Sequence, residues 1–331
     1  MKAAVYTRYG PPDILKIADV ERPVPKDDEV LVEVHAASLN AGDWYLMRGK
    51  PFLVRMAGGG LMKPRNQRLG ADLAGRVVAI GAGITKFKPG DEVFGDTGIG
   101  SGSIAEYACA RESDLVLKPA SMAFEEAAAV PLASVTALIG LRDEGRVQPG
   151  QKVLINGGSG GVGTFAVQIA KAMGAEVTAT CSPGKVDLLR SIGADRVIDY
   201  TKEDCTREGP LYDVILGVNG YHPLWAYGRA LKQGGIYIMV GGSMGQILQG
   251  FLLSRLIPLG GGKRIGVVGV TTERRARASQ DLAYVKELIE AGKVKPVIDR
   301  LFPIDETAEA LRYAEEGHVR GKVVITVANR A

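Results

Sequence analysis

A glycine-rich turn between an apolar strand and an apolar helix constrains the fold of this chain more than any other feature. The segment Lys152 to Gly163 reads KVLINGGSGGVG, and its apolar start at residues 153–155 predicts a buried parallel strand. Beyond the glycines, apolar residues recur at helical spacing until Gly174, which predicts a helix. Strand, tight turn and helix in this order fit G-x-G-x-x-G, the pattern of a dinucleotide site.

Each glycine of this turn has a predicted role. Gly158 permits the turn, Gly160 lets the backbone approach a pyrophosphate, and Gly163 lets helix and strand pack closely. The amino end of the helix offers unpaired N–H groups to the anion. A glycine-rich turn without a ligand is the alternative, and the flanking strand and helix disfavour it. The cofactor contacts predicted here are Gly158, Ser159, Gly160, Gly161, Val162 and Gly163.

The end of the next predicted strand indicates which dinucleotide binds. An NAD site usually has Asp or Glu about 20 residues beyond the glycines, where it accepts from the ribose 2′-hydroxyl. This chain has Ser182 and Lys185 instead, and Tyr200 closes the following strand. A carboxylate would repel a 2′-phosphate, whereas these donors would hold it, so the sequence predicts NADPH. Alternatively, Lys185 is a solvated helix residue that Asp187 partly neutralises.

Composition excludes several other classes of protein. A length of 331 residues with 46% hydrophobic residues predicts two domains of a soluble globular protein. The net charge of +4 is mild, and without a basic stripe among aromatic residues we expect no nucleic-acid partner. We also expect no membrane partner and a cytoplasmic location, since no long uncharged apolar span or signal peptide is present. Wide spacing of Cys109, Cys181 and Cys205 disfavours disulfides and structural zinc.

Two patterns of predicted elements divide the chain. Residues 1–123 contain short strands between Gly, Pro and Asp turns, which predict a partly open β-barrel. Residues 124–270 alternate helices with strand candidates and end in an edge run at 265–270, which predicts an α/β doubly wound parallel sheet. The tail, 271–331, ends in a strand at 322–327 that has no place in this sheet, so we assign it to the first domain.

Two further segments allow two interpretations each. The loop 52–68 is rich in Gly, Met and basic residues, and it is either a mobile surface excursion or a flap over a substrate cleft. The segment 244–259 is strongly apolar, but it is too short to span a membrane and Arg255 interrupts it. We expect it to form a helix over the cleft or an oligomer contact.

The order of barrel, nucleotide-binding sheet and returning tail resembles the medium-chain dehydrogenase/reductase superfamily. The stretches similar to its zinc-independent quinone oxidoreductase branch are SLNAGDW, LGADLAGRVVAIGAGITKFKPGDEVFG, AAAVPLASVTAL, VLINGGSGGVGTFAVQIAK, GADRVIDY, AGKVKPVIDR and GHVRGKVVI. The resemblance covers nearly the whole chain. It implies a GroES-like barrel and a Rossmann sheet, NADPH-dependent reduction of a quinone or an α,β-unsaturated carbonyl, and a homodimer paired through residues 265–270.

Departures from the zinc-containing alcohol dehydrogenases lead us to predict no metal. Asn40 stands where those enzymes carry a cysteine ligand, and Gly70-Ala71-Asp72 resembles their Gly-His-Glu without its imidazole. Catalytic zinc needs three converging protein ligands. The histidines of this chain lie in dissimilar contexts, at His35, His222 and His318.

Without zinc to polarise a carbonyl, conjugate reduction is easier than direct ketone chemistry. Hydride goes to the β-carbon, and the charge moves to an oxygen that donors stabilise. The resemblance places Asn40, Asp43 and Tyr45 at the cleft, and we predict Tyr45 and Asn40 as the catalytic residues, with Tyr45 donating to that oxygen. Tyr45 could equally be an ordinary half-buried tyrosine, and we expect Asp43 to be structural.

The resemblance also extends the predicted cofactor site to later strand ends and to the tail. It adds Thr136, Val218, Asn219, Gly241, Gly242 and Lys322. Lys322 is alternatively a solvated strand lysine. Two other functions stay open: a metal-free, alcohol dehydrogenase-like carbonyl reductase, and a non-catalytic NADPH-binding protein.

Overall fold

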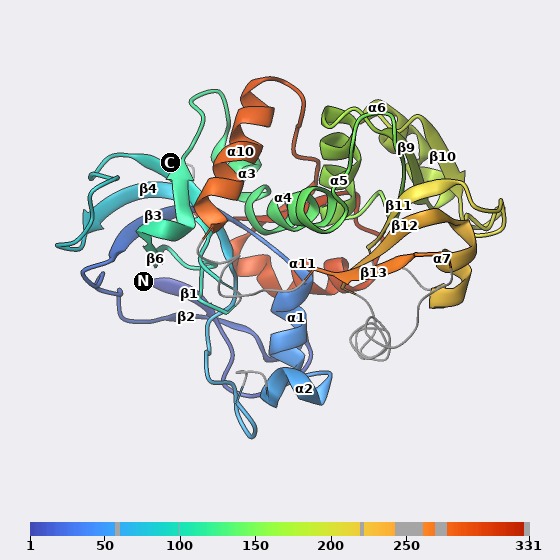
Figure 1. The fold of residues 1–331 in the computed structure, drawn as a ribbon. Helices are drawn as coiled ribbons and strands as arrows, with labels where there is room; N and C mark the ends of the chain where they lie inside the picture. The colour runs from blue at the N-terminus through green and yellow to red at the C-terminus, as the bar shows by residue number, and fades with distance from the viewer. Residues whose placement is uncertain (57–59, 99, 219–221, 242–260, 269–276, 328–331) are drawn as a thin grey trace. The chain divides into compact units, whose positions relative to one another are not determined.

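The chain divides into two compact units. The computed structural model describes it apart from residues 57–59, 99, 219–221, 242–260, 269–276 and 328–331 (Figure 1). The first unit contains Met1–Ala133, Glu273–Tyr284 and Pro296–Ala331, and the second contains Ser134–Thr272 and Val285–Lys295. These bounds differ from the predicted ones, 1–123 with 271–331 and 124–270, at both junctions.

Side-chain contacts explain both differences. Helix α3 (Phe124–Ala128) belongs to the first unit, where the Phe124 ring stacks on His35 of strand β3 (Glu29–Ser38) with centroids 4.1 Å apart. The chain after helix α10 (Ala278–Glu290) is held in the second unit, because the Gln168 side chain accepts from the Lys295 N–H and donates to its carbonyl.

The first unit is built on a sheet of seven strands in the order β14-β15-β3-β4-β5-β7, with β6 also paired to β3. A separate antiparallel pair joins β1 to β2. The bounds are β1 Lys2–Val5, β2 Lys16–Asp19, β4 Asp72–Ile80, β5 Glu92–Asp96, β6 Tyr107–Arg111, β7 Leu115–Leu117, β14 Ile298–Pro303 and β15 Lys322–Thr326. Strand β15 pairs antiparallel with β3, with Ile325 opposite Ala37, so the assignment of the final strand to this part of the chain is confirmed.

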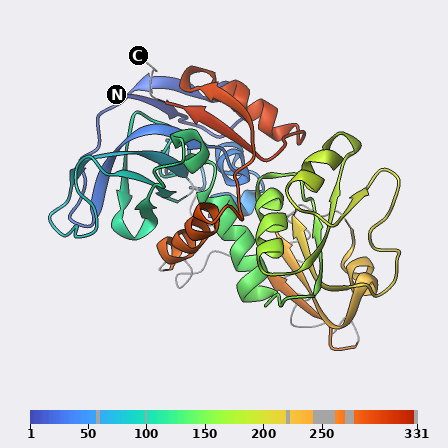
Figure 2. The same ribbon diagram turned by 90° about the horizontal axis from the view of Figure 1, so that it is seen from above.

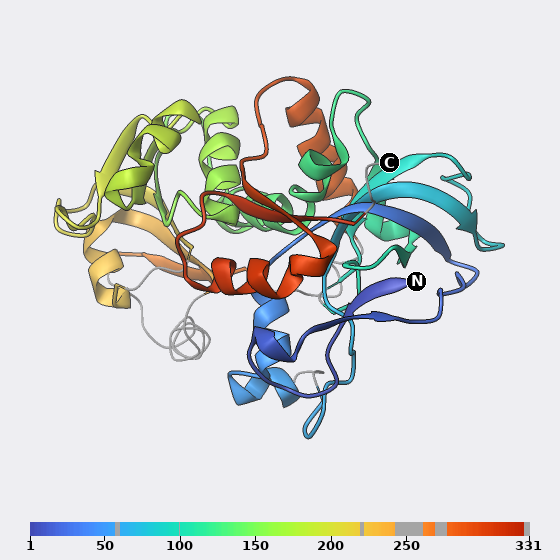
Figure 3. The same cartoon turned by 180° about the vertical axis from the view of Figure 1, so that it is seen from behind.

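Strand β14 is an element that the sequence does not predict. It contains Asp299 and Arg300 and ends at Pro303, a composition that reads as a turn. In the structure it lies at the edge of the sheet, parallel to β15, among the red segments of Figure 3. Its Phe302 side chain is buried in the core. Parallel pairing with a strand about 25 residues along the chain is a long-range contact that local composition does not reveal.

The second unit is a parallel sheet of six strands in the order β10-β9-β8-β11-β12-β13 (Figure 2). The bounds are β8 Lys152–Asn156, β9 Glu176–Cys181, β10 Arg196–Asp199, β11 Tyr212–Val218, β12 Leu231–Val240 and β13 Arg264–Val267. This is the doubly wound order, and the predicted Rossmann sheet is confirmed. The strand order reverses between β8 and β11, and the crevice at such a switch point is where these sheets bind ligands.

Helices flank both sheets, and none of those described is long and apolar enough to cross a bilayer. In addition to α3 and α10, their bounds are α1 Ala41–Arg48, α2 Phe52–Val54, α4 Pro131–Leu138, α5 Gly161–Ala172, α6 Val186–Ser191, α7 Leu224–Ala230 and α11 Thr307–Glu315. Helix α5 follows the glycine turn directly, and its residues 163–170 are buried. The predicted apolar segment 244–259 lies outside the described residues.

Candidate functional site

The turn between β8 and α5 is shaped by a glycine that the sequence motif does not include. Gly157 has φ of +92°, and a Cβ there would meet the Val218 carbonyl at 2.2 Å. Gly157 therefore makes the tight turn, and the assignment of that role to Gly158 was wrong. A Cβ on Gly158 would instead lie 2.9 Å from the Ala179 side chain, so this glycine allows the turn to pack on β9.

Gly160 and Gly163 differ in what surrounds them. A Cβ on Gly163 would meet the Gly157 carbonyl at 2.1 Å, which confirms that this glycine allows close packing of helix and strand. A Cβ on Gly160 would meet only the Gly157 carbonyl, at 4.0 Å. Gly160 is also the N-cap of α5, in extended conformation and without a side-chain cap. The helix end is thus open at the position where a pyrophosphate would approach.

A chain of hydrogen bonds holds this turn against the ends of strands β8 and β9. The Gly157 N–H donates to Thr180 Oγ1 at 2.9 Å, and that hydroxyl donates to Asn156 Oδ1 at 2.6 Å. Asn156 Nδ2 in turn donates to the Tyr227 hydroxyl at 2.6 Å. Asn156 and Thr180 were not predicted as site residues, although Asn156 is the last residue of β8 and Thr180 the second-last of β9. That position was the signal that could have identified them.

The residues predicted to hold a 2′-phosphate lie on neighbouring strand ends. Ser182 follows β9, and Tyr200 follows β10, whose Asp199 is paired with Cys181. The Tyr200 N–H donates to the Cys181 carbonyl, and the Lys185 N–H donates to that of Ser182. Ser182 and Lys185 are half-buried, whereas the Tyr200 side chain is 60% exposed. The structure therefore gathers these donors beside the glycine turn, at the same edge of the sheet.

Other predicted cofactor residues are only partly placed. Val218 ends β11, directly beside the glycine turn, and Gly241 follows β12 with φ of +69°. Thr136 is half-buried in α4, in the second unit. Asn219 and Gly242 lie outside the described residues.

A buried polar cluster in the first unit contains two predicted site residues. Lys322 is 3% exposed, and its Nζ lies 2.6 Å from Asn40 Oδ1 and 3.3 Å from Asp72 Oδ2. Asp72 also accepts from Ser38 Oγ, Asn40 Nδ2 and the Leu132 N–H. Lys322 is therefore not a solvated strand lysine. Its ammonium balances the buried Asp72 carboxylate, as a buried charge requires.

Asp43 is buried beside this cluster and orders the start of α1. Its Oδ2 accepts from the Asn40 N–H at 2.7 Å, so its predicted structural role is confirmed. Burial, followed by repulsion from Asp72, raises the pKa of the Asp43 carboxyl from 3.8 to about 7, while the Asn40 N–H and Lys322 oppose the shift. Its Oδ1 has no hydrogen-bond partner among the described residues.

Tyr45, the predicted proton donor, lies on α1 two residues after Asp43. Its side chain is 39% exposed, and its ring centroid lies 6.0 Å from that of Trp44. A partly exposed tyrosine on an ordered helix can reach a bound molecule, and ordinary surface tyrosines show the same exposure. Its catalytic role stays a prediction.

The side chains around Asn40 and Asp72 do not fit the ligand set of a catalytic zinc. Zinc is held by Cys, His and carboxylate groups, and catalytic sites use three of them. The buried polar cluster offers the Asp72 carboxylate, whose oxygens already accept hydrogen bonds, the Asn40 amide and the Lys322 ammonium. A cation already neutralises Asp72, so a metal would have to displace Lys322 into a buried, unpaired state.

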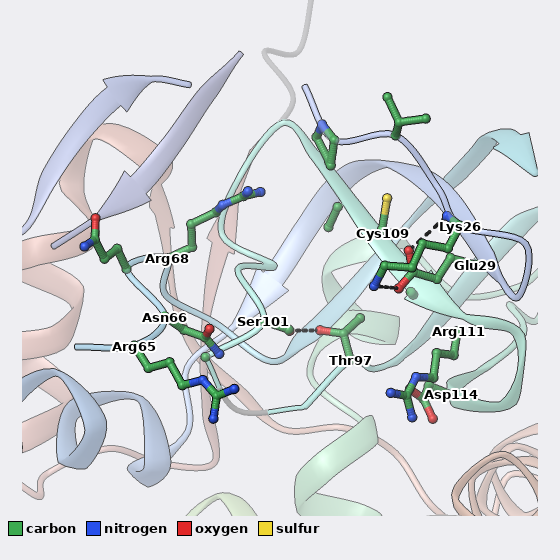
Figure 4. Close-up of a pocket in the computed structure, with 16 residues that line it drawn as sticks. Lys26, Glu29, Arg65, Asn66, Arg68, Thr97, Ser101, Cys109, Arg111 and Asp114 are labelled. Atoms are coloured by element: carbon green, nitrogen blue, oxygen red, sulfur yellow. Dashed lines mark hydrogen bonds and ion pairs between the residues drawn. The ribbon is translucent and has the colours of Figure 1, made fainter. Parts of the chain in front are cut away.

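The first unit also has an open polar cavity of about 780 Å³ (Figure 4). Arg65 and Arg68, from the end of the loop 52–68, form part of its wall, and Thr97 and Ser101 share a hydrogen bond there. The described residues that line it include none of the predicted catalytic or cofactor residues. Whether the loop acts as a flap stays a prediction.

Comparison with known families agrees with this architecture. Residues 26–120 match the family model of the alcohol dehydrogenase GroES-like domain, and residues 192–325 match that of the zinc-binding dehydrogenases. The chain is 36% identical to 2-methylene-furan-3-one reductase of Solanum lycopersicum, over 98% of this chain and 79% of that protein. It belongs to the quinone oxidoreductase branch of the medium-chain dehydrogenase/reductase superfamily.

Other members of the superfamily match equally broadly. The chloroplastic NADPH-dependent alkenal/one oxidoreductase of Arabidopsis thaliana is 34% identical, over 98% of this chain and 79% of its own length. Among solved structures, the quinone oxidoreductase of Coxiella burnetii superposes with a TM-score of 0.85 at 30% identity, and the match covers 99% of each chain. These matches confirm the predicted superfamily, branch and fold.

Proposed function

We propose that this medium-chain reductase uses NADPH to reduce quinones or α,β-unsaturated carbonyls without zinc. The observation that carries the proposal is the open turn at Gly160, next to strand ends that bear Ser182, Lys185 and Tyr200. The segment that follows β9 has no acidic side chain before Asp187. Relatives named as alkenal/one and quinone oxidoreductases, at 34% and 30% identity, support the substrate class.

The second unit would hold the cofactor through backbone and side-chain donors. The N–H groups at the amino end of α5 would face the pyrophosphate, and Gly160 leaves room for it. Ser182, Lys185 and Tyr200 would hold the 2′-phosphate, because phosphate takes hydroxyl and ammonium donors and rejects carboxylates. When bound, NADPH supplies hydride.

Asn40 and Tyr45 have different parts in the proposed chemistry. Asn40 uses its carbonyl for Lys322 and one amide N–H for Asp72, which leaves at most one N–H for a substrate. Asn40 is therefore mainly a positioning residue that fixes the start of α1. Tyr45, further along that helix, is the described hydroxyl that we propose as donor to the substrate oxygen.

Conjugate reduction suits a site with these donors. Reducing an isolated ketone without a Lewis acid places full charge on the oxygen as hydride adds at its carbon. In an enone or quinone the charge is delocalised, so a phenol and backbone donors suffice. The full charge that direct ketone reduction places on the oxygen disfavours the alternative of an alcohol dehydrogenase-like carbonyl reductase.

A substrate panel tests the proposal. NADPH consumption would be followed with quinones, enals, enones, saturated ketones and alcohols plus NADP, on protein whose metal content has been measured. We expect turnover of quinones or enones that does not change when the protein is treated with a chelator. Oxidation of alcohols would favour the carbonyl reductase, and tight NADPH binding without turnover would favour a non-catalytic role.

We also propose a homodimer joined through strand β13. Among the residues that the structure describes, this strand forms the edge of the parallel sheet and pairs only with β12. An edge strand exposes N–H and carbonyl groups that a second copy can pair with. Size-exclusion chromatography with light scattering would check this state. Cytoplasmic location and the expected absence of nucleic-acid and membrane partners stay predictions.

A further inference from the structure

Three chemically different metal-binding side chains converge in the second unit, away from the glycine turn. Asp204 and Cys205 lie in the connection between β10 and β11, and His222 lies just before α7. One ligand atom from each lies within 4.8 Å of the other two. Cys205 Sγ is 4.0 Å from His222 Nε2, and Asp204 Oδ1 is 3.8 Å from His222 Nδ1.

One imidazole binds a given ion through a single ring nitrogen, so the ligand set is the three atoms that lie within 4.8 Å of one another, and these atoms would move closer together when an ion binds. Metal–ligand bonds of about 2.0–2.3 Å place neighbouring ligand atoms about 3–4 Å apart in a tetrahedral site. Thiolate, imidazole and carboxylate are the zinc ligands, and three of them leave a fourth position for water. A thiolate and a carboxylate also balance the charge of a divalent cation.

The surroundings already hold one ligand in place and leave a path for entry. Asp204 Oδ1 accepts from the Thr206 N–H and hydroxyl at 2.9 and 2.7 Å, and its Oδ2 accepts from Arg207 Nε at 3.1 Å. Such outer hydrogen bonds orient the ligands of metal sites. The Asp204 and His222 side chains are 30% and 32% exposed, whereas Cys205 is 3% exposed and forms the inner wall.

We propose that Asp204, Cys205 and His222 bind a thiophilic divalent cation of the zinc class. Binding breaks the S–H bond of Cys205 and forms a metal–sulfur bond, and the proton leaves to solvent. The ion would tie the β10–β11 connection to the start of α7, across β11. The site is separate from the proposed catalytic residues, so it stabilises the nucleotide-binding unit and takes no part in hydride transfer.

The sequence did not predict this site. Cys205 and His222 are 17 residues apart. The expectation of no metal came from the wide spacing of the three cysteines and from the missing catalytic ligands at Asn40 and Gly70-Ala71-Asp72. Only the fold brings the two connections together, because Cys205 precedes β11 and His222 follows it. The inference does not depend on the proposed reductase activity.

Metal titration of the full chain tests the proposal. The purified protein would be stripped with a chelator and titrated with Co²⁺, then with Zn²⁺ in competition. We expect one ion per chain, a thiolate-to-cobalt charge-transfer band, release of a proton, and a higher thermal midpoint with Zn²⁺. Changing even an outer partner of a metal ligand costs about 10–100-fold in affinity, so His222→Gln should lower it by more than about 10-fold.

Matched variants decide the outcome. Cys205→Ser should abolish the charge-transfer band, whereas Cys181→Ser, at another buried cysteine, and His318→Gln should leave it unchanged. If Cys205→Ser fails to fold, His222→Gln decides, because the His222 side chain is 32% exposed and glutamine keeps a polar side chain at its contact with Tyr227. The proposal would be overturned if the parent protein showed no charge-transfer band, or if His222→Gln bound Co²⁺ with unchanged affinity.

Discussion

At the scale of single residues, the charges that matter most are those that the fold removes from water. Asp43, Asp72 and Lys322 are all buried in the first unit, and Lys322 is the cation that the described residues bring to the two carboxyl groups. Lys322 balances Asp72, and Asp43 responds by holding its proton to higher pH. The pH dependence of stability should therefore report on Asp43.

Asp43→Asn should remove a pH-dependent part of the stability. The pKa of Asp43 is about 7 in the folded chain against 3.8 ordinarily, so the folded chain keeps a proton that the unfolded chain loses between these values. Wild-type stability relative to Asp43→Asn should thus be highest near pH 4 and fall by up to roughly 4 kcal/mol as pH rises towards 8. Urea unfolding of both proteins across this range would measure it, and a constant difference would contradict the raised pKa.

Lys185→Glu should change the choice of cofactor. A carboxylate would repel the 2′-phosphate and remove a charged donor, so the dissociation constant for NADPH should rise roughly tenfold to a hundredfold, and that for NADH far less. Lys152→Glu makes the same charge change at the amino end of β8, the opposite edge of the sheet, and should leave the NADPH/NADH preference unchanged. Equal loss of both cofactors in Lys185→Glu would refute the phosphate assignment.

Sequence reasoning succeeded for residues whose role depends on close neighbours. The packing role of Gly163 and the position of Ser182 and Lys185 after β9 could be predicted because strand, turn and helix are consecutive in the chain. The role of Ser182 and Lys185 as phosphate donors stays a prediction. The alternative that Lys322 is a solvated strand lysine was wrong, because Lys322 is buried and its partner Asn40 is 282 positions away. No local pattern marks a lysine that will be buried against a distant carboxylate.

At the scale of elements, the glycines of the β8–turn–α5 unit differ in role. Two of them are needed for folding, whereas the third leaves room for a ligand. Gly157 and Gly163 contact backbone atoms that cannot move, whereas Gly160 borders open space. The motif alone could not show this difference, since it also gave the turn to Gly158. The parallel strand order was predictable from alternating apolar runs, but the edge strand β14 was not, because its partner is set by the tail.

Paired alanine variants should separate stability from binding. Gly160→Ala should change the free energy of unfolding by less than about 1 kcal/mol, yet weaken NADPH strongly, because its methyl group occupies the pyrophosphate position. Gly163→Ala should cost about 1–3 kcal/mol or more, because its Cβ would overlap the Gly157 carbonyl. Urea unfolding and NADPH titration would measure both quantities. Unchanged NADPH affinity in folded Gly160→Ala would show that the turn binds no pyrophosphate.

At the scale of the whole molecule, two units carry separate parts of the proposed reaction. The second unit offers the dinucleotide crevice, and the first offers Tyr45 on a helix ordered by Asn40 and Asp43. Family membership and the sheet orders follow from patterns that extend over nearly the entire sequence. The substrate does not follow from them, because pocket shape depends on segments such as the loop 52–68, whose composition leaves its conformation open.

The position of a transferred deuterium tests the central claim most directly. The chelator-treated protein would be incubated with an enone and NADPH deuterated at the transferred position of nicotinamide C4, and the product analysed by NMR. Conjugate reduction predicts a saturated ketone with deuterium on its β-carbon. Deuterium on the carbonyl carbon of an allylic alcohol, or unchanged enone and quinone in the presence of NADPH, would contradict the account.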